Sequence, residues 1–198
     1  MLDYSKGAEY SITNCDRLET TAKIILEDDN GTDSFALFLY YIAYEEISKA
    51  IFCLFVHRGW INEDYVLKVF REHKYKIFLF DEIFKSFQIQ SGKVYLGGKE
   101  LGEKALEEFI QEHATIIKEH RDKTKAFLYV DKNSNWKVPL VEIPNISEEE
   151  MKIKSKITAL RGISHLIKTK YDAKLSQVGN FKFIEKEDGT FEIQFDAI

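Results

Sequence analysis

The sequence lacks the marks of several common classes of protein. Its two cysteines, Cys15 and Cys53, stand in helical patterns with no metal-ligand spacing around them, so we expect reduced thiols in the core. No Gly-rich phosphate loop, serine-nucleophile motif or HExxH zinc motif is present. We therefore expect neither a metal site nor a bound cofactor.

A surplus of positive charge and a targeting segment are also lacking. Lys and Arg number 28 against 33 Asp and Glu, which gives a formal net charge of −5. This balance disfavours a broad surface that coats nucleic acid, but it leaves room for a small basic site in a dimer cleft. The first ten residues contain no basic start followed by an apolar run, so we expect no signal peptide and a cytoplasmic protein.

What the sequence does contain is one long apolar segment, Ser34–His57 (SFALFLYYIAYEEISKAIFCLFVH). A helix that is apolar on all sides is a buried helix, and this one is long enough to raise the question of a membrane span. Glu45, Glu46 and Lys49 lie in its middle, where each charge would cost about 2.5–3.5 kcal/mol in a bilayer. We therefore predict the central helix of a soluble bundle that does not enter a membrane.

The three charges of this helix are spaced to interact. Glu46 and Lys49 are three residues apart and Glu45 and Lys49 are four apart, so both pairs lie on or near one helical face. One interpretation is an internal salt bridge of the bundle. The other is a functional site, in which a carboxylate orients a cation or a histidine.

Apolar residues recur at helical spacing on both sides of the central helix. With that helix included, five helices are predicted: Tyr10–Asp28, Ser34–His57, Glu63–Phe87, Lys99–Lys125 and Ser147–Ser176. Shorter extended segments are predicted at Val94–Leu96, in an irregular hairpin of Ala126–Asp131 with Trp136–Ile143, and in a C-terminal hairpin, Phe181–Phe195. That hairpin should turn at Asp188-Gly189, with a shared apolar face of Phe181, Phe183, Phe191, Ile193 and Phe195.

The chain is thus predicted to be one mainly α domain, 1–198, built as an up-and-down helical bundle with small β-hairpin additions. Its predicted parts are a helical core (10–125), an extended hairpin insert (126–146), a C-terminal helix (147–176) and a C-terminal β-hairpin (181–196).

Positive charge is concentrated in two clusters. His73 lies among Arg71, Lys74 and Lys76; a lone histidine is usually a surface residue, but one flanked by cations can sit beside a phosphate and serve as a neutral base. The second cluster is His120, Arg121 and Lys125. Cations at a helix end can simply favour the helix dipole, or they can hold a phosphodiester.

Several motifs, taken in order, resemble a known family. They are Asn14 and Leu18 in the first helix, Ala43–Ala50 (AYEEISKA) in the central helix, Phe70–Lys76 (FREHKYK), and Arg121–Asp131 (RDKTKAFLYVD) followed by Pro139. The first two motifs resemble the opening helices of HEPN domains. The whole set is similar to the AbiV abortive-infection family of bacterial phage-defence proteins, with the resemblance running from Asn14 to Pro139.

The resemblance implies a HEPN-like helical bundle that forms a homodimer and acts as a metal-independent endoribonuclease between two subunits. The usual HEPN signature is an arginine followed, after four to six residues, by a histidine. Here Arg161 and His165 have only three residues between them, and we interpret this pair as mostly structural. Two hypotheses therefore stand: a phage-defence ribonuclease that shuts down translation or growth, and a non-catalytic helical module that binds a phage protein or a translation component.

For the ribonuclease we predict a site built from both basic clusters and the central helix. His73 is the acid and base, Arg121 and Lys125 hold the phosphate, and Glu46 with Lys49 orients these groups. The residues expected to bind RNA are Arg71, Lys74, Lys76 and His120. The expected partners are ribosomal, transfer or messenger RNA and a phage-encoded activator protein.

Overall fold

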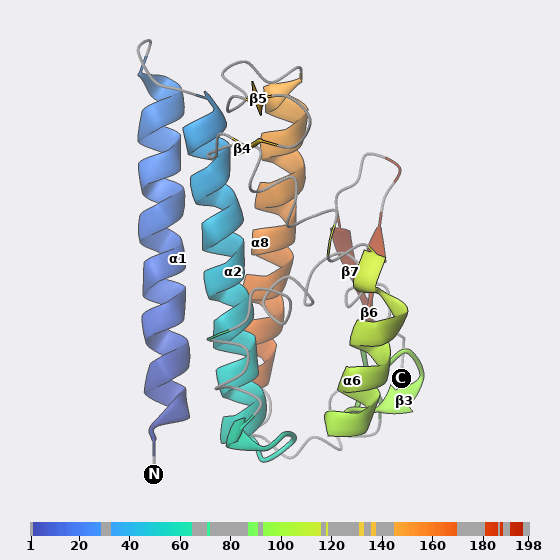
Figure 1. Ribbon diagram of the computed structural model, residues 1–198. Helices are drawn as coiled ribbons and strands as arrows, with labels where there is room; N and C mark the ends of the chain where they lie inside the picture. The colour runs from blue at the N-terminus through green and yellow to red at the C-terminus, as the bar shows by residue number, and fades with distance from the viewer. Residues whose placement is uncertain are drawn as a thin grey trace.

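The computed structural model describes residues 2–28, 33–64, 71, 87–90, 93–115, 118, 131–132, 136–137, 145–169, 181–185, 187 and 191–195. Three long helices dominate this part of the chain: α1 (Tyr4–Glu27), α2 (Asp33–His57) and α8 (Ile146–Thr169). Figure 1 shows α2 between α1 and α8, with α1 antiparallel to α2 and α8 running in the same direction as α2. The predicted mainly α bundle is confirmed.

Helix α2 begins one residue before its predicted start and ends at His57 as predicted. Its side chains are buried along most of its length, which makes it the most buried element of the described part of the chain. This follows from a sequence with almost no polar face. No helix among the described residues combines the length and the hydropathy that a membrane span needs.

Helix α1 begins at Tyr4, six residues before the predicted start at Tyr10, so that prediction was wrong. The reason is a cap: the backbone N–H of Lys6 donates to the Asp3 carboxylate over 3.1 Å. Aspartate in this position satisfies one of the free N–H groups of a first helical turn. The apolar periodicity that set the predicted start becomes regular only one to two turns later.

Helix α8 begins at Ile146 and is described to Thr169, whereas the prediction was Ser147–Ser176. Asn145 precedes it with φ 60°, a left-handed conformation that asparagine adopts more readily than most residues. The carbonyl of Asn145 accepts from the N–H groups of Glu148 and Glu149. Residues 170–176 lie outside the described part of the chain.

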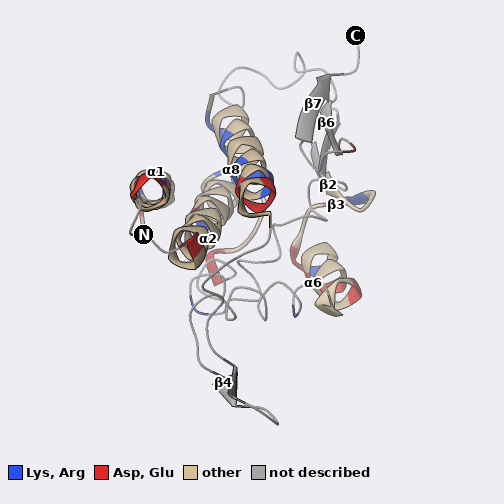
Figure 2. Cartoon of the chain, turned by 90° about the horizontal axis from the view of Figure 1, so that it is seen from above, with Lys and Arg blue, Asp and Glu red and all other residues tan. Residues whose placement is uncertain are grey.

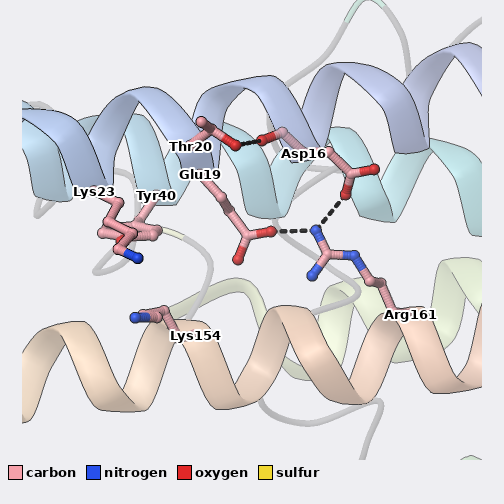
Figure 3. A pocket seen from close by; sticks show the side chains of 7 residues that line it. All are labelled: Asp16, Glu19, Thr20, Lys23, Tyr40, Lys154 and Arg161. Carbon is pink, nitrogen blue, oxygen red and sulfur yellow. Dashed lines mark hydrogen bonds and ion pairs between the residues drawn. The ribbon is translucent and has the colours of Figure 1, made fainter.

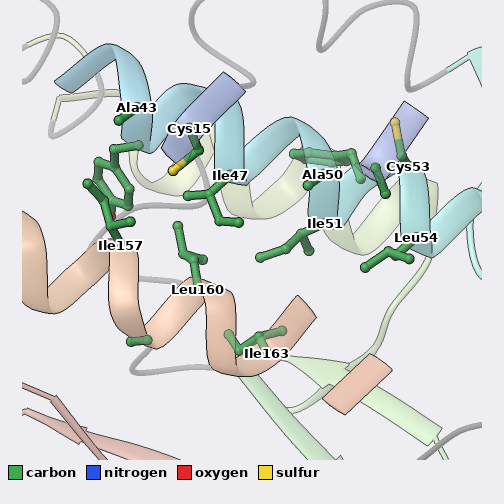
Figure 4. Packing of buried hydrophobic residues seen from close by; sticks show 14 of the residues in the cluster. Cys15, Ala43, Ile47, Ala50, Ile51, Cys53, Leu54, Ile157, Leu160 and Ile163 are labelled. Atoms are coloured by element: carbon green, nitrogen blue, oxygen red, sulfur yellow. The ribbon is translucent and has the colours of Figure 1, made fainter. Parts of the chain in front are cut away.

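The core of the bundle forms where α2 faces α8 and α1. Figure 4 shows Ile47, Ile51 and Leu54 of α2 directed toward Leu160 and Ile163 of α8. All five side chains are buried, and at about 25 cal/mol per Å² of buried apolar surface such contacts provide most of the stabilisation of the bundle. This core fixes the spacing of the three helices and so the position of every charged group between them.

The middle of the chain departs from the predictions. Of the predicted helix Glu63–Phe87, the described residues Glu63, Asp64 and Arg71 are helical, but Phe87 opens a strand, β1 (Phe87–Gln90). The predicted extended segment at Val94–Leu96 is confirmed as β2 (Lys93–Leu96).

The predicted helix Lys99–Lys125 was wrong at its start. Lys99–Glu100 form strand β3, and helix α6 runs from Glu103 to Glu112. The reason is a turn at Gly97 and Gly98, which have φ values of 58° and 77°. Glycine adopts such values without steric cost. The turn reverses the direction of the chain, so that β3 pairs antiparallel with β2.

Helix α6 also ends before the predicted position. His113 is not helical, and its ring Nδ1 and backbone N–H both lie within hydrogen-bond distance of the Phe109 carbonyl oxygen, at 2.8 Å and 3.1 Å. The following described residues Ala114, Thr115 and Lys118 are helical again. The single continuous helix of the prediction is therefore interrupted at His113.

The C-terminal hairpin is present, but it belongs to a larger sheet than predicted. Strands β6 (Phe181–Glu185) and β7 (Phe191–Phe195) pair antiparallel, and β6 also pairs with β1. The order of the five-stranded sheet is β3-β2-β1-β6-β7. Because an isolated hairpin is marginal in water, this pairing explains how the hairpin is held. Figure 1 shows β6 and β7 beyond α8, on the side away from α1, and Figure 2 shows α6 on this same side. Strand β7 approaches α8.

The register of this hairpin corrects the predicted turn. Phe183 pairs with Ile193 and Glu185 with Phe191, so an odd number of residues separates the strands, whereas a two-residue turn at Asp188-Gly189 would pair Phe183 with Gln194. The observed register sets apolar residues opposite apolar residues, which is what specifies register in a strand pair. The predicted shared face is consistent with this register.

A second small sheet lies at the tip of the other predicted hairpin. Strands β4 (Asp131–Lys132) and β5 (Trp136–Lys137) pair antiparallel, as the prediction of a hairpin there requires. The remainder of both predicted arms lies outside the described residues.

Candidate functional site

The charged pair in the middle of α2 is the first part of the site. Lys49 Nζ donates to Glu46 Oε1 within the helix, and the two side chains are only 16% and 11% exposed. The prediction that these residues are paired rather than solvated is confirmed. Glu45 beside them is 5% exposed. Charges this covered are stable only when a partner compensates the loss of hydration.

Both cysteines lie close enough to this pair to feel its charges, and both are free and buried. Burial raises the pKa of Cys15 to about 12, and the carboxylates of Glu19 and Glu46 add to the rise. Burial raises the pKa of Cys53 to about 11, although the Lys49 ammonium opposes the shift. A thiol with a raised pKa is neither a nucleophile nor a ready metal ligand, so the cysteines are the core thiols that the sequence predicted.

A second charged cluster joins α1 to α8. Arg161 Nη2 donates to Asp16 Oδ1 over 2.5 Å, to Glu19 Oε2, and to Cys15 Sγ over 3.6 Å. Figure 3 shows the guanidinium between the two carboxylates. Burial alone would lower the pKa of Arg161, but its hydrogen bond to Glu19 and the nearby negative charges outweigh burial, so the pKa is raised.

Cys15, Asp16 and Glu19 are also the one group in the described part of the chain with ligand atoms close enough together to hold a metal ion. The Arg161 guanidinium occupies that position and already supplies the positive charge. The thiol, moreover, is held protonated by burial. The donor set therefore suits an interhelical ion pair rather than a metal centre.

Two tyrosines connect α2 to the first turn of α8. Tyr41 donates to Glu149 over 2.5 Å, and Tyr40 donates to Glu150 over a longer 3.5 Å. Burial raises the pKa of Tyr40 to about 12, with the Glu150 charge as the next cause. The Lys154 ammonium lies 5.8 Å from the centre of the Tyr40 ring, within the range of a cation–π interaction.

A pocket of about 300 Å³ lies between α1 and α8, beside these groups. Figure 3 shows its lining: Asp16, Glu19, Thr20, Lys23, Tyr40, Lys154 and Arg161. The Arg161 ion pairs close one end, and the two lysines lie at the other. The pocket therefore has an ion-paired end, with Arg161 between two carboxylates, and an end that carries two lysines.

The C-terminal ends of α2 and α8 are also connected by hydrogen bonds. Arg58 Nη2 donates to the carbonyl oxygens of Ile167 and Lys168 over 2.9 Å and 3.0 Å, where the last carbonyls of a helix lack partners within it. Lys168 Nζ in turn lies 2.7 Å from Glu9 Oε1 of α1. α8 is thus fixed to its neighbours along its length.

The predicted site residues fall into two groups. Glu46 and Lys49 are brought together in α2, and Arg71 is helical and exposed. The other predicted residues lie outside the described part of the chain: His73, Lys74, Lys76, His120, Arg121 and Lys125. Their roles, and the groove that they were predicted to share, remain predictions.

Sequence reasoning missed the partners of Arg161. The pair Arg161 and His165 was interpreted as mostly structural, and Arg161 is indeed ion-paired, while His165 is exposed. Asp16 and Glu19 are three residues apart and so share a helical face, which was the available signal. It could not show which distant cation would meet them.

A helical bundle with a charged pair buried in its central helix is the arrangement that the resemblance to HEPN domains implied. A comparison with protein-family models identifies the particular family: the AbiV model of the HEPN group matches residues 3–158. The chain belongs to the AbiV family and is an abortive-infection protein of the HEPN type. Searches of curated proteins and of solved structures each found no match.

Proposed function

We propose that this AbiV protein is a metal-independent ribonuclease that shuts down translation or growth of an infected cell. The observation that carries the proposal is the family match over residues 3–158. The match spans the Glu46–Lys49 pair and both basic clusters, Arg71–Lys76 and His120–Lys125. It therefore includes every residue to which we assign a role.

The chemistry is cleavage by the RNA's own ribose. The 2′-OH attacks the adjacent phosphorus, the 5′-oxygen leaves, and a 2′,3′-cyclic phosphate remains. His73 takes the proton from the 2′-OH and returns one to the leaving oxygen. Arg121 and Lys125 hold the phosphate and stabilise the added negative charge of the phosphorane.

The buried pair has a positioning role in this scheme. Glu46 and Lys49 are bonded to each other and are 11% and 16% exposed, so neither is well placed to reach a substrate. We assign them to orienting the groups that do, from the centre of the most buried helix. Arg71, Lys74, Lys76 and His120 neutralise the RNA backbone, which is the main source of affinity for nucleic acid.

The proposed active form is a homodimer. A chain of net charge −5 binds RNA only where its cations are concentrated. A two-fold axis repeats every contact of an isologous interface, so a shared groove would double the charge of each basic cluster and bring two copies of His73 near one RNA strand. A phage-encoded protein is the proposed trigger.

Incubation of the purified protein with total RNA in EDTA tests the function. In the presence of the phage-encoded activator we expect cleavage by the wild-type protein, lost in His73→Ala and in Arg121→Ala. The matched controls are His165→Ala and Arg17→Ala, which remove an exposed histidine and an exposed arginine of the bundle and should cleave as the wild type does. Full activity in both site variants would contradict the assignment.

A non-catalytic interaction module is the second candidate. It is favoured by the state of the charged groups in the described bundle: Glu46, Lys49 and Arg161 are ion-paired, and burial keeps both thiols protonated. Such a module would bind a phage protein or a translation component. Intact RNA under activating conditions, together with one stable partner in a pull-down, would favour it over the ribonuclease.

A further inference from the structure

The pocket between α1 and α8 holds two lysines that face each other. Figure 3 shows the amino groups of Lys23 on α1 and Lys154 on α8 directed toward the same end of the pocket, beside Tyr40. Two like charges pointed into one space repel each other. An anion between them would turn this repulsion into two attractions.

Each lysine has a carboxylate partner in its own helix, and Lys154 also lies over the Tyr40 ring. Lys23 Nζ lies 3.6 Å from Glu27 Oε1, and Lys154 Nζ lies 3.1 Å from Glu150 Oε1. Both are pairs within one helix, and the lysine side chains are 66% and 46% exposed. Pairs in which the lysine is this exposed contribute little to stability, so either ammonium group can turn to an incoming anion, although Glu150 itself is only 26% exposed.

The carboxylates in the pocket do not prevent this. Asp16 and Glu19 are both bonded to Arg161, which neutralises much of their charge at the other end of the pocket. Burial keeps the Tyr40 phenol protonated, so no further negative charge arises beside the lysines. The volume of about 300 Å³ corresponds to roughly ten water molecules, enough for a phosphate and its attached sugar.

We propose that this pocket binds a phosphate group between Lys23 and Lys154. The ammonium groups of Lys23 on α1 and Lys154 on α8 are the contacts. The phosphate belongs either to a free mononucleotide or to an RNA backbone, since both present the same oxygens to the lysines. The site uses none of the residues assigned to cleavage, so it goes beyond the proposed function.

Calorimetric titration with inorganic phosphate and with adenosine monophosphate tests whether the site binds a free phosphate group. Fluorescence anisotropy with a short single-stranded RNA tests whether it binds the phosphate of an RNA backbone. The test variant is Lys23→Ala/Lys154→Ala. Its control, Lys6→Ala/Lys152→Ala, removes one lysine from each of the same two helices outside the pocket. We expect roughly tenfold weaker phosphate binding in the test variant and less than a twofold change in the control.

Two further measurements make the result specific. Lys23→Arg/Lys154→Arg keeps both charges and should retain binding, and circular dichroism checks that each variant is folded. If RNA occupies the site, the slope of log K against log salt should become shallower by about 0.7 in the test variant, since one neutralised phosphate of single-stranded RNA contributes about 0.7. An unchanged RNA affinity with lost phosphate binding would assign the site to free mononucleotides.

The inference is overturned if the wild type binds neither phosphate nor RNA. It is also overturned if the test and control variants lose affinity equally, because an equal loss would reflect the change in net charge and not a site between Lys23 and Lys154. Its failure is separate from that of the ribonuclease. Absence of RNA cleavage contradicts the proposed function and leaves this site in place. Unchanged phosphate binding in Lys23→Ala/Lys154→Ala contradicts this site and leaves the ribonuclease in place.

Discussion

Glu46 and Lys49 are a pair of charged side chains in a helix that is otherwise buried and apolar. They lie in a helix that is otherwise apolar on nearly every side, and they compensate each other there. Replacing one partner removes this ion pair from a nearly covered charged group, which costs more than the pair itself contributes. Removing one member of the pair should therefore lower the free energy of unfolding, whether or not the pair also serves the proposed site.

Glu46→Ala should lower the free energy of unfolding by roughly 3 kcal/mol, because Lys49 would lose its ion pair with Glu46 in a nearly covered position. Glu9→Ala is the matched control, since it breaks the exposed pair with Lys168, where the loss should be no more than about 1 kcal/mol. Urea denaturation measures both. Equal losses of unfolding free energy in the two variants would show that burial does not increase the contribution of the Glu46–Lys49 pair to stability.

The buried thiols should make the free energy of unfolding depend on pH in the alkaline range. Burial raises the pKa of Cys15 from 9.0 to about 12 and that of Cys53 from 9.0 to about 11. Because both pKa values are raised in the folded state, the stabilisation is fully present below the pKa of the unfolded thiol and is lost as the pH rises toward the folded values.

The free energy of unfolding should therefore fall as the pH rises above about 9, and it should fall less steeply in Cys15→Ala/Cys53→Ala. Urea denaturation at a series of pH values measures both curves. Parallel curves for the variant and the wild type would mean that the thiols ionise equally easily in the folded and unfolded states.

Helices and strands differed in how well the sequence predicted them. α2 was predicted to within one residue because nearly every position in Ser34–His57 is apolar. The start of α1 was missed because the Asp3 cap lies outside the apolar periodicity. The sheet was missed because the pairing of β1 with β6 joins residues about ninety positions apart, and no local pattern encodes which distant strand a segment will meet.

The register of the C-terminal hairpin can be tested with engineered cysteines in a background that carries Cys15→Ala and Cys53→Ala. Phe183→Cys/Ile193→Cys places two thiols at paired positions, so a disulfide should form readily on mild oxidation. Phe183→Cys/Gln194→Cys joins the positions that a two-residue turn would have paired, and it should remain largely reduced. Preferential oxidation of the second variant, measured by thiol titration, would contradict the observed register.

The whole molecule combines a bundle with ion pairs between its helices and two basic segments that we propose to bind RNA. The sequence predicted the fold class and the family, because buried periodicity and an ordered set of motifs are both local properties. It did not predict the contacts of Arg161 with Asp16 and Glu19, which bring the middle of α1 to the second half of α8. Such contacts depend on how helices pack, which spacing within one helix does not specify.

The proposed site depends on a property of the whole molecule, the formation of a homodimer, which is itself a proposal. Light scattering at micromolar concentration should give twice the 23.2 kDa of one chain. Analytical ultracentrifugation of Arg121→Ala should give the same mass, because the residue is assigned to the phosphate and not to the interface. A wild-type protein that remains monomeric would remove the shared groove from the model.

The chemistry of the RNA ends tests the central claim most directly. RNA incubated with the protein in EDTA should carry 2′,3′-cyclic phosphates on the upstream fragments and 5′-hydroxyls on the downstream ones, because the ribose 2′-OH is the proposed nucleophile. Mass spectrometry of the fragments from wild-type protein and from His73→Ala measures this, and the ends should be absent in the variant. RNA that stays intact with the wild-type protein and its activator, or fragments ending in 3′-hydroxyl and 5′-phosphate, would contradict the account.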